Sequence, residues 1–85
     1  MDLQNLCQLT KEEFDRRNLK SNVRYNALEK IISFLSQKYG NDLKCFQNSK
    51  DVLKNEYEKD KGKILNSAEK SAFNELFNQF QKVKK

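Results

Sequence analysis

The sequence predicts an all-α fold, a small bundle of about four helices, and three observations support this. The 85-residue chain has no proline and two glycines, which leaves little turn material for a β-rich fold. Residues 23–39 spread their apolar side chains over an arc of about 200°, which is wider than the ~100° stripe of an ordinary surface helix. Six Phe and three Tyr compensate for an apolar content of 36%, because each aromatic ring buries a large area.

The length predicts one domain, residues 1–85. A chain of this size buries roughly 60–65% of the surface that its unfolded form exposes, which suffices for one modest core. We expect residues 1–9 to form a frayed or docked N-terminal arm. Leu3, Leu6 and Cys7 in this arm have helical spacing, so it can also dock as a single turn.

The first helix is predicted at 11–19. Thr10 and Glu13 have the spacing of a capping box, and Leu9 and Phe14 flank it like a hydrophobic staple. A break is predicted at 18–21, because Asn and Ser are poor helix-interior residues and good caps. The alternative is one continuous helix over 11–39.

The second helix, 22–39, is predicted to be the central element, because an arc of apolar residues that wide must contact more than one neighbour. Gly40 follows it and supplies the left-handed conformation that ends many helices. Leu43 and Phe46 are spaced for a short helical turn at 42–47.

Two more helices are predicted at 50–61 and 67–83. Asn48 or Ser49 caps the first and Gly62 ends it, while Asn66 and Glu69 form a second capping-box pattern before the last helix. The last helix is clearly amphipathic. The expected core is formed by Leu28, Ile31, Leu35, Phe73, Leu76, Phe77 and Phe80.

The composition argues against an enzyme, a metal site or a cofactor site. There is no histidine, which is the commonest general base and a frequent metal ligand. Cys7 and Cys45 are too few for a four-cysteine zinc site, and no glycine-rich phosphate loop is present. We expect no catalytic, cofactor-binding or metal-binding residues. Without a secretory segment or an apolar stretch of about 20 residues, we expect an intracellular, cytoplasmic protein with reduced thiols and no membrane partner.

Basic residues are the one feature that suggests a site, since the formal net charge is +5. All three arginines fall within nine residues, and the candidate contacts for an anionic partner are Arg16, Arg17, Lys20 and Arg24. Arginine binds phosphate and carboxylate through a planar fork. The plainer interpretation is a solvated basic corner.

A second candidate basic face lies on the helix at 50–61 and contains Lys50, Lys54 and Lys61. A helix-turn-helix can be drawn from 43–47 and 50–61. However, Glu56, Glu58 and Asp60 lie on the same helix and would meet phosphate unfavourably.

Two functions remain open. The first is a small non-enzymatic protein-binding regulator, inhibitor or accessory subunit that docks on a larger macromolecular partner. The alternative is a basic nucleic-acid-binding regulator that uses either of the two basic faces. Mixed charge along most of the chain favours the protein partner, because a nucleic-acid binder concentrates its positive charge. The very apolar segment 23–39 also suggests a homodimer.

Overall fold

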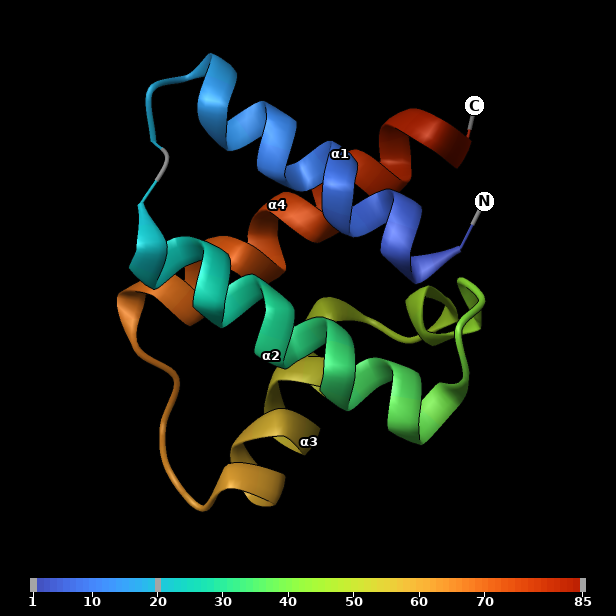
Figure 1. Cartoon of the computed structure of the whole chain (residues 1–85). Helices are drawn as coiled ribbons and strands as arrows, with labels where there is room; N and C mark the ends of the chain where they lie inside the picture. Colours follow the sequence, from blue (N-terminus) through green and yellow to red (C-terminus); the bar gives the residue numbers. More distant parts are fainter. Residues whose placement is uncertain (1, 20, 85) are drawn as a thin grey trace.

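The described chain folds into four α-helices and one short 3-10 helix. The structure is a computed structural model and describes residues 2–19 and 21–84. The elements in chain order are α1 (Leu3–Arg16), α2 (Asn22–Tyr39), η1 (Lys44–Gln47), α3 (Lys50–Lys61) and α4 (Ser67–Lys84). No strand occurs within these residues (Figure 1). The predicted all-α bundle of four helices with a short helical turn is therefore confirmed.

The start of α1 differs from the prediction. The helix begins at Leu3, where Asp2 caps it by accepting a hydrogen bond from the Asn5 backbone N–H at 2.9 Å. Thr10, the predicted cap, lies inside the helix and donates its hydroxyl to the Leu6 carbonyl at 2.8 Å. Residues 3–9 are therefore part of α1 rather than a separate arm. The physical reason is burial: the helix extends by two turns because Leu3 and Leu6 are both fully buried.

The predicted break after α1 is confirmed, although the helix ends at Arg16 rather than at residue 19. Asn18 adopts a positive φ of 57°, and the Leu19 N–H donates to the Phe14 carbonyl at 2.7 Å. The Asn18 N–H donates to the Asp15 carbonyl at 3.1 Å. These two bonds form a Schellman motif with asparagine in the left-handed position. A continuous helix over 11–39 is excluded.

The other boundaries follow the prediction closely. Ser21 caps α2 and Ser49 caps α3, each through a side-chain oxygen that accepts a backbone N–H. Gly62 ends α3 in the left-handed conformation. Gly40 ends α2 with a φ of 87° but an extended ψ, so it is not the left-handed cap that we expected. Helix α4 extends one residue beyond the predicted end at 83.

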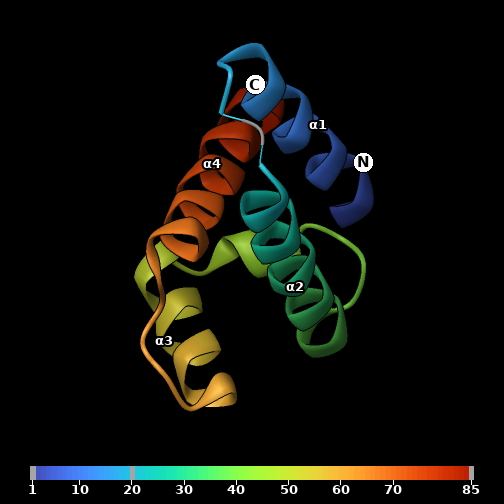
Figure 2. The same ribbon diagram turned by 60° about the vertical axis from the view of Figure 1, so that its left-hand side comes forward.

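Helix α4 shares the central position with α2, which the sequence predicted as the central element. It has extensive contacts with α1 and α2 and further contacts with α3. Helix α2 packs against α1, α4 and η1, and it meets α3 through an edge-to-face contact of Phe34 with Tyr57. In Figure 1, α4 crosses behind the hairpin of α1 and α2, and both Figures 1 and 2 show α3 at the opposite end of the molecule from α1. The two longest helices thus share the central role.

The core contains the residues that the sequence predicted. Leu28, Ile31, Leu35, Phe73 and Leu76 are all fully buried. Phe77 and Phe80 are only partly buried and pack on the edge of the core. Both of these rings lie against Phe46 of η1, with ring centroids 5.0 and 4.9 Å away.

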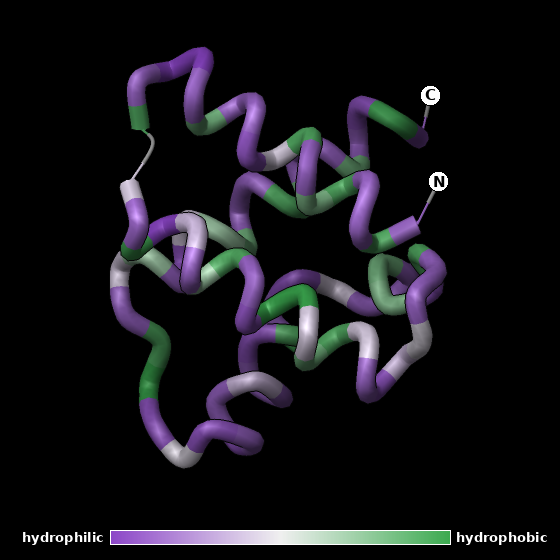
Figure 3. The backbone as a smooth tube through the Cα atoms, in the orientation of Figure 1, coloured by the Kyte–Doolittle hydropathy of each residue, from purple (hydrophilic) through white to green (hydrophobic). Residues whose placement is uncertain are grey.

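Helix α2 is better covered than the homodimer expectation assumed. Six of its apolar residues are buried, and Val23 is its one strongly exposed aliphatic residue within the described chain. Homodimerisation stays a prediction, but exposed apolar surface on α2 no longer supports it. Light scattering that detects only a 10.1 kDa species would exclude it. In Figure 3, a hydrophobic stretch is visible in the connection between α3 and α4, outside the helices. No helix in the described part of the chain is both long and apolar enough to cross a bilayer.

Candidate functional site

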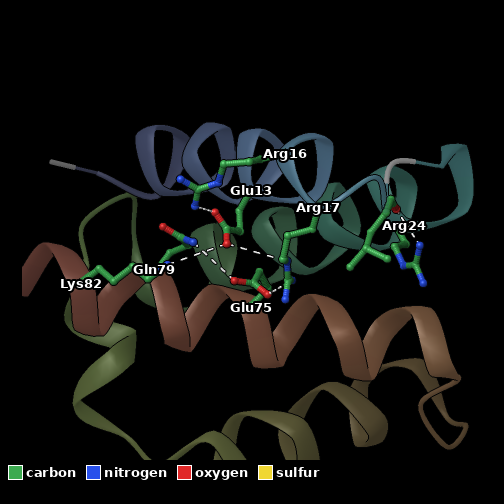
Figure 4. Close-up of polar contacts among 8 residues, drawn as sticks. Glu13, Arg16, Arg17, Arg24, Glu75, Gln79 and Lys82 are labelled. Carbon is green, nitrogen blue, oxygen red and sulfur yellow. Dashed lines mark hydrogen bonds and ion pairs between the residues drawn. The ribbon is translucent and has the colours of Figure 1, made fainter.

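The described residues of the predicted basic corner come from two elements and differ in their contacts. Arg16 and Arg17 lie at the end of α1 and reach acidic groups, whereas Arg24 lies in the first turn of α2 (Figure 4). Arg17 and Arg24 both line one concavity of about 280 Å³. Lys20 lies outside the described residues. Two of its arginines therefore form ion pairs, and the third, Arg24, forms none with the residues that the structure describes.

Arg16 and Arg17 belong to a charge cluster between α1 and α4. Its members are Glu13, Arg16, Arg17, Glu75, Gln79 and Lys82. Glu13 pairs with Arg16, lies 3.7 Å from the Arg17 Nε, and lies 3.9 Å from the Lys82 Nζ. Glu75 accepts from Arg17 and, at 3.4 Å, from the Gln79 amide. Figure 4 shows these side chains filling the space between the two helices.

The cluster has a structural role, since both of its carboxylates are nearly buried. Side-chain exposure is 11% for Glu13 and 8% for Glu75. Removing the cation from a buried carboxylate strongly destabilises the folded protein. Reversing the charge of Arg17 would therefore disturb folding as well as any binding. Arg16, at 70% exposure, is the member that remains largely solvated.

The second predicted basic face lies along α3, and its lysines differ in their partners. Lys61 of α3 is paired with Asp60 at 3.8 Å and lies over the Tyr57 ring. Lys50 and Lys54 are half-buried and have no carboxylate within 4.0 Å among the described residues. The first helix of the drawn helix-turn-helix is the four-residue η1, which is too short to act as the supporting helix of that motif.

A groove of about 490 Å³ lies where the N-terminal ends of α2 and α4 meet. We call it the α2–α4 groove. It is lined by Ser21, Val23, Arg24, Asn66, Ser67, Ala68 and Ser71. Its volume is within the range of ligand sites, which span roughly 300–1,000 Å³. Local capping creates this arrangement, because Ser21 fixes the start of α2 and the reciprocal bonds of Asn66 and Glu69 fix the start of α4.

One exposed aliphatic side chain lines this groove, and another lies in the segment that leads to it. Val23 is 65% exposed, and Ile64, two residues before the groove residue Asn66, is 79% exposed. The neighbour of Ile64, Leu65, is buried, and its N–H donates to the Glu58 carboxylate at 3.0 Å. The backbone beside Ile64 is therefore held in place while the Ile64 side chain faces solvent.

Arg24 supplies positive charge to the groove. One N–H of its guanidinium donates to the Leu19 carbonyl at 2.6 Å. Within the described residues, no carboxylate forms an ion pair with it. Because α2 has no acidic residue in its first turn, the positive end of its helix dipole adds to this charge.

The two thiols have the properties of structural cysteines. Cys7 and Cys45 are both free and buried. Burial raises the pKa of the Cys7 thiol and raises the pKa of the Cys45 thiol to about 11, so the reactive thiolate is disfavoured at neutral pH. Nowhere in residues 2–19 and 21–84 do three His, Cys, Asp or Glu side chains gather so that they could hold a metal ion.

Sequence reasoning selected Arg24 but missed its surroundings. The groove brings residues 21–24 together with residues 66–71, and no local pattern signals that approach. The charge cluster was also missed, because Glu13 was interpreted as part of a capping box. The i, i+3 and i, i+4 spacings from Glu13 to Arg16 and Arg17 were the available signal.

Comparison with known proteins adds no relative. Neither a protein-family model, nor a curated protein, nor a solved structure matches this chain.

Proposed function

We propose that this protein is a small non-enzymatic protein-binding module, acting as a regulator, inhibitor or accessory subunit, and that the α2–α4 groove is its docking surface. The observation that carries the proposal is a concave groove whose lining includes an exposed aliphatic side chain. Val23 lines the groove, and Ile64 lies in the adjoining connection. Exposed aliphatic residues beside a concavity are typical of protein interfaces, whereas isolated ones are ordinary.

The chemistry available in the chain supports binding rather than catalysis. The sequence contains no histidine. Both buried carboxylates of the charge cluster are engaged by Arg17 or its neighbours, which is typical of a structural ion-pair network. The groove itself presents hydroxyl, amide and guanidinium groups, which suit recognition.

A protein partner also fits the distribution of charge better than nucleic acid does. Arg16 and Arg17 are engaged by Glu13 and Glu75, so the predicted arginine corner does not present three unpaired cations to a phosphate backbone. A nucleic-acid binder needs several such contacts on one face. Nucleic acid is therefore an outcome that the experiment must be able to detect.

The test uses two exposed valines near the start of different helices. Val23→Glu places a charge at the groove, whereas Val52→Glu makes the same change on α3, where Val52 is 43% exposed. Each tagged variant is used to capture partners from lysate of the source cells, with and without nuclease. We expect captured protein to fall at least about tenfold with Val23→Glu, because a central interface residue is worth about 2 kcal/mol or more. Val52→Glu should capture as the wild type does.

Two results would contradict the proposal. Equal capture by both variants would show that the groove is not the docking surface. Capture that disappears on nuclease treatment and weakens steeply with salt would identify nucleic acid as the partner, because neutralised phosphates release condensed counterions. Circular dichroism of both variants checks that the helices remain intact.

A further inference from the structure

The α2–α4 groove continues into a second concavity along α4. The second concavity has a volume of about 280 Å³, and Arg24 and Ser71 line both of them. Together they follow α4 from Asn66 to Asn78. Twelve helical steps of 1.5 Å correspond to a trough of about 18 Å. An extended chain rises about 3.3 Å per residue, so the trough matches roughly five residues of an extended segment.

The trough carries a positive charge that is unpaired within the described part of the chain. Arg24 lies in its middle, and only one of the five N–H groups of its guanidinium has a partner among the described residues. Arg17 and Glu75 also line the second concavity, where they pair with each other. The nearby Glu69 accepts from the Tyr57 hydroxyl and the Asn66 N–H. The middle of the trough therefore carries net positive charge.

The first concavity has an apolar contribution beside that charge. Val23 and Ala68 line it from opposite helices, α2 and α4. A single unpaired guanidinium matches one carboxylate in a bidentate pair, whereas a phosphate dianion is usually held by several cations or a nest of N–H groups. The trough therefore suits a ligand in which an acidic residue is adjacent to an apolar residue.

We infer that the trough binds an extended segment of the partner protein, with a carboxylate on Arg24 and an apolar side chain against Val23 and Ala68. This inference rests on the proposed function and specifies the chemistry of the partner. Charge complementarity is the argument for the occupant. The chain has a net charge of +5, and Arg24, which has no carboxylate partner among residues 2–19 and 21–84, lies in this trough.

The test compares two capped peptides, acetyl-Ala-Leu-Glu-Leu-Ala-amide and its twin with Gln in place of Glu. Each is titrated against the full-length protein while amide shifts are followed by NMR. We expect saturable shifts in residues 21–24 and 66–71, with the Glu peptide binding roughly three- to tenfold more tightly than the Gln peptide, because a partly exposed charge-assisted pair is worth about 1 kcal/mol. Arg24→Gln should remove this preference.

Arg16→Gln is the matched control, since it removes the same charge from an exposed arginine outside the groove. It should leave the preference intact. If Arg24→Gln fails to fold because the bond to the Leu19 carbonyl is lost, Arg24→Lys keeps the charge without the planar fork and should reduce the preference to about twofold or less. Thermal melts of each variant establish which comparison applies.

Four outcomes overturn the inference. Two concern selectivity: both peptides bind equally, or Arg16→Gln loses the preference for the Glu peptide as completely as Arg24→Gln does. The other two concern the ligand: neither peptide gives a saturable amide shift up to about 10 mM, or inorganic phosphate shifts the same amides more than the Glu peptide does. The last would assign the site to a phosphate-bearing ligand. These results are separable from the proposed function. If Val23→Glu abolishes protein capture while Arg24→Gln leaves it unchanged, the docking surface stands and the carboxylate contact falls.

Discussion

Tyr57→Phe tests the buried connection between α3 and the start of α4. The Tyr57 hydroxyl donates to the Glu69 Oε2 at 2.9 Å, and the two residues are 1% and 5% exposed. The other carboxylate oxygen of Glu69 accepts the Asn66 N–H at 3.0 Å. Removing the hydroxyl leaves one oxygen of a buried carboxylate without its partner, in a place that water reaches poorly.

The expected loss is about 2 kcal/mol, within the range of 1–3 kcal/mol for orphaning a buried hydrogen-bonding group. For a domain of this size, 1 kcal/mol shifts the melting temperature by about 4–8 °C, so Tyr57→Phe should lower Tm by roughly 8–16 °C. Thermal unfolding followed by circular dichroism at 222 nm measures this shift. The ring keeps its edge-to-face contacts with Phe34 and Phe73, so packing changes little.

Tyr39→Phe is the matched control. The Tyr39 hydroxyl also donates to a glutamate, Glu56, but both side chains are partly exposed and water can replace the lost bond. Its expected cost is below about 0.5 kcal/mol. If the two variants melt within a few degrees of each other, burial of the Tyr57–Glu69 pair does not contribute the free energy that we assign to it.

Three further predictions concern the core, the start of α1 and alkaline pH. Leu76→Ala should cost about 2–5 kcal/mol, because Leu76 is fully buried on α4, whereas Val52→Ala should stay within about 0.5 kcal/mol; an unchanged urea midpoint in Leu76→Ala would mean that α4 is not docked. Asp2→Ala should lower the free energy of unfolding by about 1 kcal/mol, because Asp2 caps α1. Thr10→Val should lower it by less than about 0.5 kcal/mol, because the Thr10 hydroxyl only adds a second hydrogen bond to a carbonyl inside the helix. The reverse order would place the helix start at Lys11. Burial raises the pKa of the Cys45 thiol from 9.0 to about 11. The stability that the neutral buried thiol contributes is therefore complete below pH 9 and is lost as the pH rises through 11. A shift of about two pKa units corresponds to roughly 3 kcal/mol, and denaturation midpoints at about pH 8 and about pH 11 should differ less in Cys45→Ala than in the wild type. The pKa values of Tyr39 and Tyr57 are also raised, so both the wild type and Cys45→Ala should lose further stability above pH 10.

Local sequence patterns determined most of the helix boundaries. Ser21 and Gly62 act at the ends of helices through their own backbone and side-chain geometry, which depends only on nearby residues. The reciprocal bonds of Asn66 and Glu69 are another case, since both partners lie within one turn. The core positions of α4 were also predictable, because helical periodicity alone assigns Phe73 and Leu76 to one face.

Local patterns failed where tertiary burial overrode them. The motif at Thr10 and Glu13 has the spacing of a cap, yet the preceding residues Leu3 and Leu6 find cover in the core, and the helix continues through Thr10. Glu13 then serves the charge cluster with α4 instead of bonding back to the helix start. The same sequence pattern fits both outcomes, and only the gain from burying the first turns selects between them.

The sequence by itself determined that this chain is a small, basic, all-α bundle with an arginine-rich bend. Only the tertiary structure decided that Arg17 is held by Glu75, 58 positions along the chain, while Arg24 is left facing a groove. The distinction arises because ion pairing depends on distance in space, and α1 packs along α4 in a way that no short window of sequence specifies.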